Sequence, residues 1–282
     1  MIQGAVVITG ASSGIGKACA LALDREGMRV FAGVRKPADG EALVAESTGN
    51  LVPIRLEVTD ASSISAAREK VLQDLGGSPL TGVVNNAGIV AIAPLEHQPV
   101  DAIRRLFEVN FVGAIATTQA FLPELRKSRG RVVFVGAAAG RVALPMIGAY
   151  SASKFAIEGA ADALRIELAS SGVRVALVEP GAIATPILHA QTIPEIAKGL
   201  LPGALEHYAG ALEAIVAAME KTQKRAISPD AVAKAVLHAL TAKSPKTRYP
   251  VGADAKFLSW FAEKLPDAMR DALVAREAGL RR

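Results

Sequence analysis

Short apolar runs alternate along this chain with longer segments whose apolar residues recur at helical spacing. The runs predict seven strands, over residues 5–9, 29–34, 52–58, 82–85, 131–135, 174–178 and 248–251. The segments between them predict helices over residues 15–26, from 60 or 62 onward, 100–127, 149–171 and from 228 onward. Because strand–helix alternation with short connections favours parallel pairing, we expect one doubly wound parallel α/β sheet with helices on both faces.

This pattern predicts a single domain over residues 1–252, followed by a C-terminal helical extension over residues 253–282. Residues 186–226 carry helical but no strand signals, so we expect them to form a lid over the carboxyl ends of the strands. The extension is amphipathic and carries Phe257, Trp260 and Phe261. Three placements are compatible with this extension: over the substrate pocket, against a neighbouring chain, or on a membrane surface.

Composition narrows the classes of function. Lysine and arginine exceed aspartate and glutamate by 32 − 27 = 5, but no basic stripe is interleaved with aromatic residues, so nucleic-acid binding is not expected. The single cysteine, Cys19, excludes an internal disulfide, and we expect a cytoplasmic protein. No run approaches about 20 apolar residues, so no integral membrane segment is predicted. His97, His189, His207 and His238 lack ligand spacing, so no metal site is predicted.

A glycine-rich loop lies between the first predicted strand and the first predicted helix. Residues 9–16 read TGASSGIG, with Gly10, Gly14 and Gly16. Glycines let the backbone turn tightly and approach a pyrophosphate, which the helix N-terminus then binds, as in Rossmann-like folds. The letters GASSG also match the nucleophile elbow of hydrolases. That elbow would sit on the first strand, and no histidine has a recognisable context, so we favour dinucleotide binding.

Four further motifs follow in order. They are NNAG at residues 85–88, Asn110 within a predicted helix, YSASK at residues 150–154, and PGAIAT at residues 180–185. With the glycine loop, they resemble the short-chain dehydrogenase/reductase family over about residues 4–251. The EPG segment at residues 179–181 and the extension resemble its steroid- and retinoid-dehydrogenase branch. The resemblance implies an oxidoreductase that uses a nicotinamide cofactor and assembles as a homodimer or homotetramer.

Tyr150 and Lys154 are four residues apart and therefore share one helix face. The ammonium group is expected to lower the pKa of the phenol from its ordinary value of about 10, which suits acid–base catalysis. The resemblance implies that Tyr150 donates a proton to the carbonyl oxygen, that Lys154 also holds the nicotinamide ribose, and that Asn110 supports a proton relay. These three residues are the predicted catalytic set.

The loop, the basic residues after the second strand and the resemblance together predict the residues that contact the cofactor. They are Gly10, Ser12, Ser13, Gly14, Ile15, Gly16, Arg35, Glu57, Val58, Asn86, Ala87, Gly88, Tyr150, Lys154, Pro180, Gly181, Ile183 and Thr185. An acid at the end of the second strand binds the ribose of NAD, and an arginine there accommodates the 2′-phosphate of NADP. Val34 occupies the acidic position and Arg35 follows it, so we expect NADP(H) to be preferred over NAD(H).

One position departs from the family pattern. The family has a serine thirteen residues before the tyrosine, where this chain has Ala137, and the flanking Gly136 and Ala138 supply no hydroxyl. Loss of such a hydrogen-bond donor costs roughly 10²–10³ in rate. Three explanations remain open: a natural variant with another donor, an introduced substitution, or a cofactor-binding protein without turnover.

The predicted substrate contacts are Ala137, Met146, Tyr150 and Leu188, in an apolar pocket. We therefore predict interconversion of a lipophilic secondary alcohol and its ketone or aldehyde counterpart. The alternative is a catalytically impaired NADP(H)-binding or regulatory protein on the same fold.

Overall fold

One parallel sheet of seven strands forms the centre of the molecule. The computed structural model describes residues 4–188, 192–277 and 280, all of these except 188, 262, 263 and 277 with their side chains. The strands are β1 (Ala5–Ile8), β2 (Arg29–Val34), β3 (Leu51–Arg55), β4 (Leu80–Asn85), β5 (Arg131–Val135), β6 (Arg174–Pro180) and β7 (Arg248–Val251). They pair in the order β3-β2-β1-β4-β5-β6-β7, every pair parallel. The predicted doubly wound, Rossmann-like fold is therefore confirmed.

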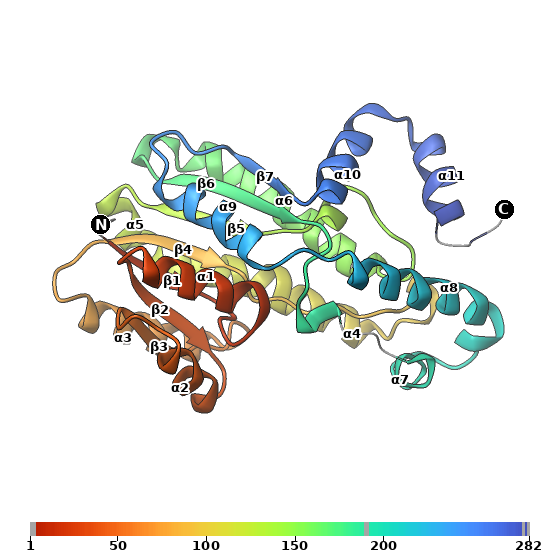
Figure 1. Ribbon diagram of the computed structural model, residues 1–282, viewed down its shortest axis with the longest axis horizontal. Helices are drawn as coiled ribbons and strands as arrows, with labels where there is room; N and C mark the ends of the chain where they lie inside the picture. The colour runs from red at the N-terminus through yellow and green to blue at the C-terminus, as the bar shows by residue number, and fades with distance from the viewer. Residues whose placement is uncertain (1–3, 189–191, 278–279, 281–282) are drawn as a thin grey trace.

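Helices cover both faces of the sheet (Figure 1). They are α1 (Gly14–Arg25), α2 (Pro37–Ala45), α3 (Ala61–Leu75), α4 (Val100–Phe107), α5 (Gly113–Ser128), α6 (Gly148–Glu167), α7 (Ile193–Ala197), α8 (Ala204–Lys224), α9 (Asp230–Thr241), α10 (Ala253–Lys264) and α11 (Asp267–Glu277). Within β1, Val6 and Ile8 pack in one core with α1 and α9, whereas Ala5 and Val7 pack in a second core with α3, α5 and α6. Burial on both faces explains why the central strands are almost continuously apolar.

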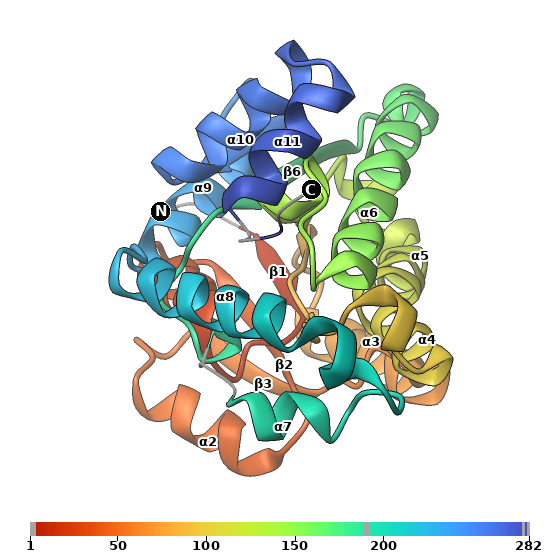
Figure 2. The ribbon, with the colours of Figure 1, turned by 90° about the vertical axis from the view of Figure 1, so that its right-hand side faces the viewer.

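The predicted lid is helical, with α7 and α8 lying beyond the end of the sheet where the carboxyl ends of the strands gather (Figure 2). Its apolar side chains form a separate cluster in which Ile196 and Leu212 pack against Ile92 and Met146. The C-terminal α10 and α11 lie beside this end of the sheet (Figure 2). Within the described parts of the chain, no helix has the length and apolar character needed to cross a membrane.

The prediction of one uninterrupted helix over residues 100–127 is wrong. A π-helical turn, Glu108–Val112, separates α4 from α5. It contains Asn110, whose side chain hydrogen-bonds the backbone N–H and carbonyl of Ile89. The extra residue of a π turn points one side chain out of the helical register, which often serves a site. Hydrophobic periodicity alone gives no signal for it.

Several element boundaries also differ from the predictions. The short helix α2 was not predicted, because only Gly40 and Leu43 are buried in it and its apolar signal is weak. Strand β3 ends at Arg55, three residues early. Helix α9 begins at Asp230, two residues later than predicted, and Ser228 Oγ accepts a hydrogen bond from the Asp230 N–H. Of the two starts predicted for α3, residue 60 or 62, the structure has the first, because the Asp60 side chain caps the helix by accepting from the N–H groups of Ser62 and Ser63.

Candidate active site

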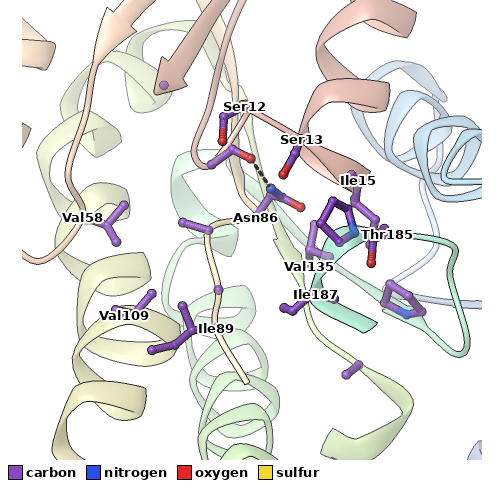
Figure 3. A pocket seen from close by; sticks show the side chains of 18 of the residues that line it. Ser12, Ser13, Ile15, Val58, Asn86, Ile89, Val109, Val135, Thr185 and Ile187 are labelled. Atoms are coloured by element: carbon purple, nitrogen blue, oxygen red, sulfur yellow. Dashed lines mark hydrogen bonds between the residues drawn. The ribbon is translucent and has the colours of Figure 1, made fainter. Parts of the chain in front are cut away.

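The loops that follow β1, β2, β3, β4, β5 and β6 surround a pocket of about 300 Å³, within the range of small-molecule sites. Most of the residues predicted to contact cofactor or substrate line it: Gly10, Ser12, Ser13, Gly14, Ile15, Arg35, Glu57, Val58, Asn86, Ala87, Gly88, Ala137, Tyr150, Lys154, Pro180, Gly181, Ile183 and Thr185. Ser12, Ser13, Ile15 and Thr185 gather on one side, and Val58, Ile89 and Val109 lie on the other (Figure 3).

Three predicted residues lie outside this lining. Gly16 and Asn110 stand behind it, and Met146 belongs to the lid cluster. The side chain of Leu188 lies outside the described residues, so its predicted contact with substrate stays a prediction. No histidine is among the pocket residues that the structure describes, so a hydrolytic triad around Ser12 gains no support.

The glycine loop has the backbone shape that its sequence predicts. Gly10 and Gly14 have φ angles of +66° and +54°, in the left-handed region that favours glycine. A Cβ on Gly16 would lie 2.1 Å from the Gly10 carbonyl oxygen, so this glycine allows the turn to close and does not itself face the pocket. Asn86 Nδ2 donates hydrogen bonds of 3.0 Å to the carbonyls of Thr9 and Gly10, which fixes the loop against β4.

The first turn of α1 can bind an anion. Ser13, which precedes the helix, makes no side-chain hydrogen bond to that turn, so the side chain leaves its N–H groups to another partner. Thr185 lies against this turn at Gly14, since its Cγ2 would be 3.0 Å from a Cβ on that glycine. The residues present therefore fit a pyrophosphate held between the loop and Thr185.

Two arginines stand at the end of the pocket where β2 and β3 finish. Arg35, exposed, follows Val34 directly and lines the pocket. Arg105, from α4, lines it as well, and its Nη1 lies 3.4 Å from Thr59 Oγ1. The Glu57 carboxylate accepts hydrogen bonds from the N–H and hydroxyl of Thr59. Sequence reasoning missed Arg105 because its approach to β3 depends on how α4 packs.

The end of β2 holds a second residue that was missed. Gly33 lines the pocket, and a Cβ there would lie 2.9 Å from the Ile8 carbonyl. A glycine inside a buried strand often marks a close approach of backbone or ligand, and this signal was available in the sequence. Other lining residues that were not predicted as contacts are Val34, Leu56, Ile89, Val109, Val135, Gly136, Pro186 and Ile187.

Tyr150 and Lys154 both face the pocket from the first turns of α6. Lys154 Nζ lies 5.9 Å from the centre of the Tyr150 ring and donates a 2.9 Å hydrogen bond to the carbonyl of Val135. Burial raises the pKa of the Tyr150 phenol to about 12 and lowers the pKa of Lys154 to about 8. The expected fall in the tyrosine pKa is therefore wrong for the protein without ligand, because desolvation exceeds the effect of the ammonium group.

Asn110 links three elements behind the pocket. Besides its two bonds to Ile89, its Nδ2 donates a 3.0 Å hydrogen bond to Ser153 Oγ. Ser153 Oγ in turn donates to the Tyr150 carbonyl at 2.7 Å. Asn110 thus positions the start of α6 against the segment that follows β4.

Ala137 stands at the end of β5 and lines the pocket together with Tyr150 and Lys154. The register is fixed by Gly140, where a Cβ would lie 3.1 Å from the Lys154 carbonyl oxygen. The two nearby serines do not replace the missing hydroxyl, because Ser153 bonds Asn110 and Ser151 Oγ accepts from the N–H of Leu144. Neither serine is among the residues that line the pocket.

The segment after β6 is fastened by the C-terminal extension. Asp254, at the start of α10, accepts a 2.6 Å hydrogen bond from the Ala182 N–H. A Cβ on Gly181 would lie 2.2 Å from the same carboxylate. The extension therefore supports the loop that carries Ile183 and Thr185, a contact that no local pattern indicated.

Comparison with known proteins agrees with this geometry. A family model for short chain dehydrogenases matches residues 4–195. The chain is 36% identical over 277 residues to human retinol dehydrogenase 5, covering 95% of this chain and 87% of that protein. It is 35% identical over 277 residues to rat 17-beta-hydroxysteroid dehydrogenase type 6, covering 96% and 87%. The chain belongs to the short-chain dehydrogenase/reductase family, in the steroid- and retinoid-dehydrogenase-like branch.

Solved structures lead to the same fold. A short-chain dehydrogenase from Streptomyces avermitilis superposes with a TM-score of 0.77 at 28% identity, covering 98% of this chain and 97% of that one. A short chain dehydrogenase from Burkholderia cenocepacia J2315, solved in complex with NADP, superposes with a TM-score of 0.73 at 28% identity, covering 98% of each. Membership of this family makes the chain an oxidoreductase that uses a nicotinamide cofactor.

Proposed function

We propose that this protein is an NADP(H)-dependent oxidoreductase that interconverts a lipophilic secondary alcohol and its ketone or aldehyde counterpart. The observation that carries the proposal is that Tyr150 and Lys154 open onto the same pocket as the glycine loop. A proton donor and a dinucleotide cradle in one cavity suit transfer of a hydride and a proton to one carbonyl group.

A nicotinamide dinucleotide, when bound, supplies or takes up the hydride. The chain supplies the proton from Tyr150, which burial keeps as the neutral phenol at neutral pH, since its pKa is about 12. A protonated phenol donates to a carbonyl oxygen, so the protein is poised for reduction near neutral pH. Lys154, as an ammonium group, favours the phenolate that remains after proton transfer.

The preference for NADP(H) rests on charge at the β2 end of the pocket. An uncharged residue, Val34, stands at the position of the ribose-binding acid, and the next residue, Arg35, lines the pocket. Arginine binds phosphate through charge-assisted, often bidentate, hydrogen bonds. The NADP complex of the Burkholderia cenocepacia neighbour is consistent with this preference.

The lipophilic substrate is inferred from the lid and from the relatives. The pocket that Tyr150 lines has apolar residues in its wall, among them Ile89, Val109 and Ile187, and the lid packs as an apolar cluster of Ile92, Met146, Ile196 and Leu212. The relatives are called retinol and 17-beta-hydroxysteroid dehydrogenases, names that refer to apolar alcohols. A homo-oligomeric state and a cytoplasmic location stay predictions.

A second candidate function follows from Ala137. The neighbouring Ser151 and Ser153 are engaged elsewhere and do not line the pocket, so Tyr150 is the hydroxyl that the start of α6 supplies to it. With one donor to the substrate oxygen instead of two, a cofactor-binding protein without turnover is the alternative.

The two candidates are separated by NADPH oxidation against a panel of lipophilic ketones and aldehydes, with the parent protein and Ala137→Ser measured side by side. We expect activity in the parent, an increase of roughly 10²–10³ in Ala137→Ser, and a loss of a similar factor or more in Tyr150→Phe. Activity in Ala137→Ser but not in the parent identifies Ala137 as the cause of the parent's inactivity. Silence in both proteins, with NADPH bound, supports the binding protein.

A further inference from the structure

Two buried carboxyl groups and two partly exposed arginines lie together one helical turn beyond Lys154. Glu158 follows Lys154 by four positions on α6, so the two share a helix face. Glu179 comes from β6, Arg248 from β7, and Arg141 from the segment after β5. Glu158 is 7% exposed and Glu179 is 1% exposed. We call these four residues the carboxyl cluster.

Within the carboxyl cluster, Arg248 contacts Glu158 more closely than Glu179. Arg248 donates two hydrogen bonds, of 3.2 Å from Nε and 3.1 Å from Nη2, to Glu158 Oε2. Its Nε lies 3.5 Å from Glu179 Oε1, and Arg141 Nη1 lies 3.9 Å from Glu158 Oε2. Arg248 also bonds Asp162, nearer the surface, which bonds Arg165 in turn. The charged groups that face Glu158 are thus Lys154 and Asp162 on its own helix, Arg141, Glu179 and Arg248.

Two buried carboxyl groups in contact favour sharing one proton, because two adjacent charges repel. Burial raises the pKa of Glu179 to about 7, and the nearby Glu158 carboxylate adds to the rise. Burial also raises the pKa of Glu158, against the opposing effect of Arg248. Since the hydrogen bonds of Arg248 go to Glu158, the shared proton resides on Glu179 and the negative charge on Glu158.

That charge lies beside the end of β5, where Lys154 is also bound. Lys154 Nζ donates to the carbonyl of Val135, and a Cβ on the next residue, Gly136, would lie 3.4 Å from Glu158 Oε1. The ammonium and the carboxylate therefore flank adjacent residues, directly before Ala137. Burial lowers the pKa of Lys154 to about 8, and Glu158 opposes this fall.

We propose that Glu158 is a positioning residue that keeps Lys154 in its ammonium form, and that Glu179 sets the charge on Glu158 by holding the proton the two carboxyl groups share. The consequence for turnover rests on the proposed function, in which Lys154 supports the Tyr150 phenolate. The charge on Lys154 itself is a property of the protein alone and can be measured without cofactor or substrate.

The test follows the ¹³Cε resonance of Lys154 by NMR from pH 6 to pH 10 in cofactor-free protein with labelled lysine. The resonance is assigned by its loss in Lys154→Arg. We expect Glu158→Gln to move the titration midpoint to lower pH by roughly one pH unit, because it removes the nearby negative charge. Glu158→Asp keeps the charge, so its titration midpoint is expected to lie close to that of the parent protein.

Asp162→Asn is the matched control. It removes one partner of the same Arg248, but this carboxylate is 44% exposed and lies a further turn from Lys154. We expect it to leave the Lys154 midpoint in place. An unchanged midpoint in Glu158→Gln, or an equal shift in Asp162→Asn, overturns the proposal.

Glu179→Gln keeps the test decisive if Glu158→Gln does not fold. The parent curve should carry a second inflection near pH 7 from Glu179, which an amide cannot produce. Persistence of that inflection in Glu179→Gln contradicts the shared proton. The alkaline limb of the pH–rate profile should shift with the NMR midpoint. Shifts in the NMR curve without turnover on any substrate would refute the proposed function and leave the proposed effect of Glu158 and Glu179 on Lys154 in place.

Discussion

The two ends of the pocket are built in different ways. At the glycine-loop end, Gly10, Gly14 and Asn86 lie within six residues of the strand that precedes them, and their geometry is set by backbone turns and by 3.0 Å hydrogen bonds from Asn86. At the substrate end, the wall combines the end of β5, the start of α6 and a lid that packs as its own cluster. Local geometry thus fixes cofactor binding, and tertiary packing sets what else can enter.

The largest effect is expected from Gly16→Ala. The new methyl would lie 2.1 Å from the Gly10 carbonyl oxygen and 2.5 Å from Asn86 Nδ2, so the loop must move. We expect about a hundredfold or greater loss of NADPH-dependent activity, since small displacements at such sites cost that much. Calorimetric titration with NADPH measures the accompanying loss of binding.

Gly159→Ala is the control for that substitution. A Cβ at Gly159, within α6, meets no atom within 4 Å. It is expected to leave NADPH binding unchanged and to stabilise the fold by about 0.5–1 kcal/mol, because alanine loses less backbone entropy in a helix. Normal binding in Gly16→Ala would show that the loop tolerates a side chain and that its closeness to β4 is not needed.

Arg35→Ser should change cofactor preference. Loss of a charge-assisted hydrogen bond to a phosphate costs about 1.5–3 kcal/mol, which is roughly a ten- to hundredfold rise in KM for NADPH. KM for NADH should stay the same. Lys36→Ser is the control, because Lys36 is exposed and does not line the pocket. Equal losses with NADPH and NADH in Arg35→Ser would argue against a 2′-phosphate site.

The substrate end is tested by Leu212→Ala. Leu212 is fully buried in the lid cluster, and truncating a buried leucine costs about 2–5 kcal/mol. We expect KM for a lipophilic ketone to rise several-fold while NADPH affinity is kept. Leu205→Ala, at an exposed position of the same helix, should change neither quantity. Weakened NADPH binding in Leu212→Ala would show that the two ends are not independent.

The smallest effect concerns stability against pH. The folded protein binds a proton on Glu179 that the unfolded chain releases above its ordinary pKa of 4.5, because the folded pKa is about 7. The free energy of unfolding should therefore fall as pH rises from 4.5 to 7 and level off above. Thermal denaturation at pH 5 and pH 7.5 should show a smaller difference in Glu179→Gln than in the parent. Glu69→Gln, on the exposed face of α3, should keep the parent's difference.

The sequence predicted the sheet and most of the pocket because both depend on local signals. Alternating apolar runs located seven strands, and parallel pairing then brought their carboxyl ends, with the loops that follow, to one edge. The predicted element boundaries were wrong where packing outweighs hydrophobic periodicity. Examples are the π-helical turn that holds Asn110 and the weakly amphipathic helix α2.

Spacing also placed Tyr150, Lys154 and Ala137 correctly in relation to each other, since one helix and one strand end carry them. It could not give the direction of the tyrosine pKa shift. Four-residue spacing indicates that a cation is near, but the degree of burial decides whether charge or desolvation dominates.

The sequence by itself determined the fold, through the alternation of apolar runs and helical segments along the chain. It also determined the glycine loop and the missing hydroxyl at position 137, because each depends on the residues of one short segment. Only the tertiary structure decided that Arg105 reaches the pocket, that Asp254 fastens the loop after β6, and that Glu158 and Glu179 share a buried site beside Lys154. These contacts join residues far apart in the chain, and their energies depend on burial and distance, which no local pattern contains.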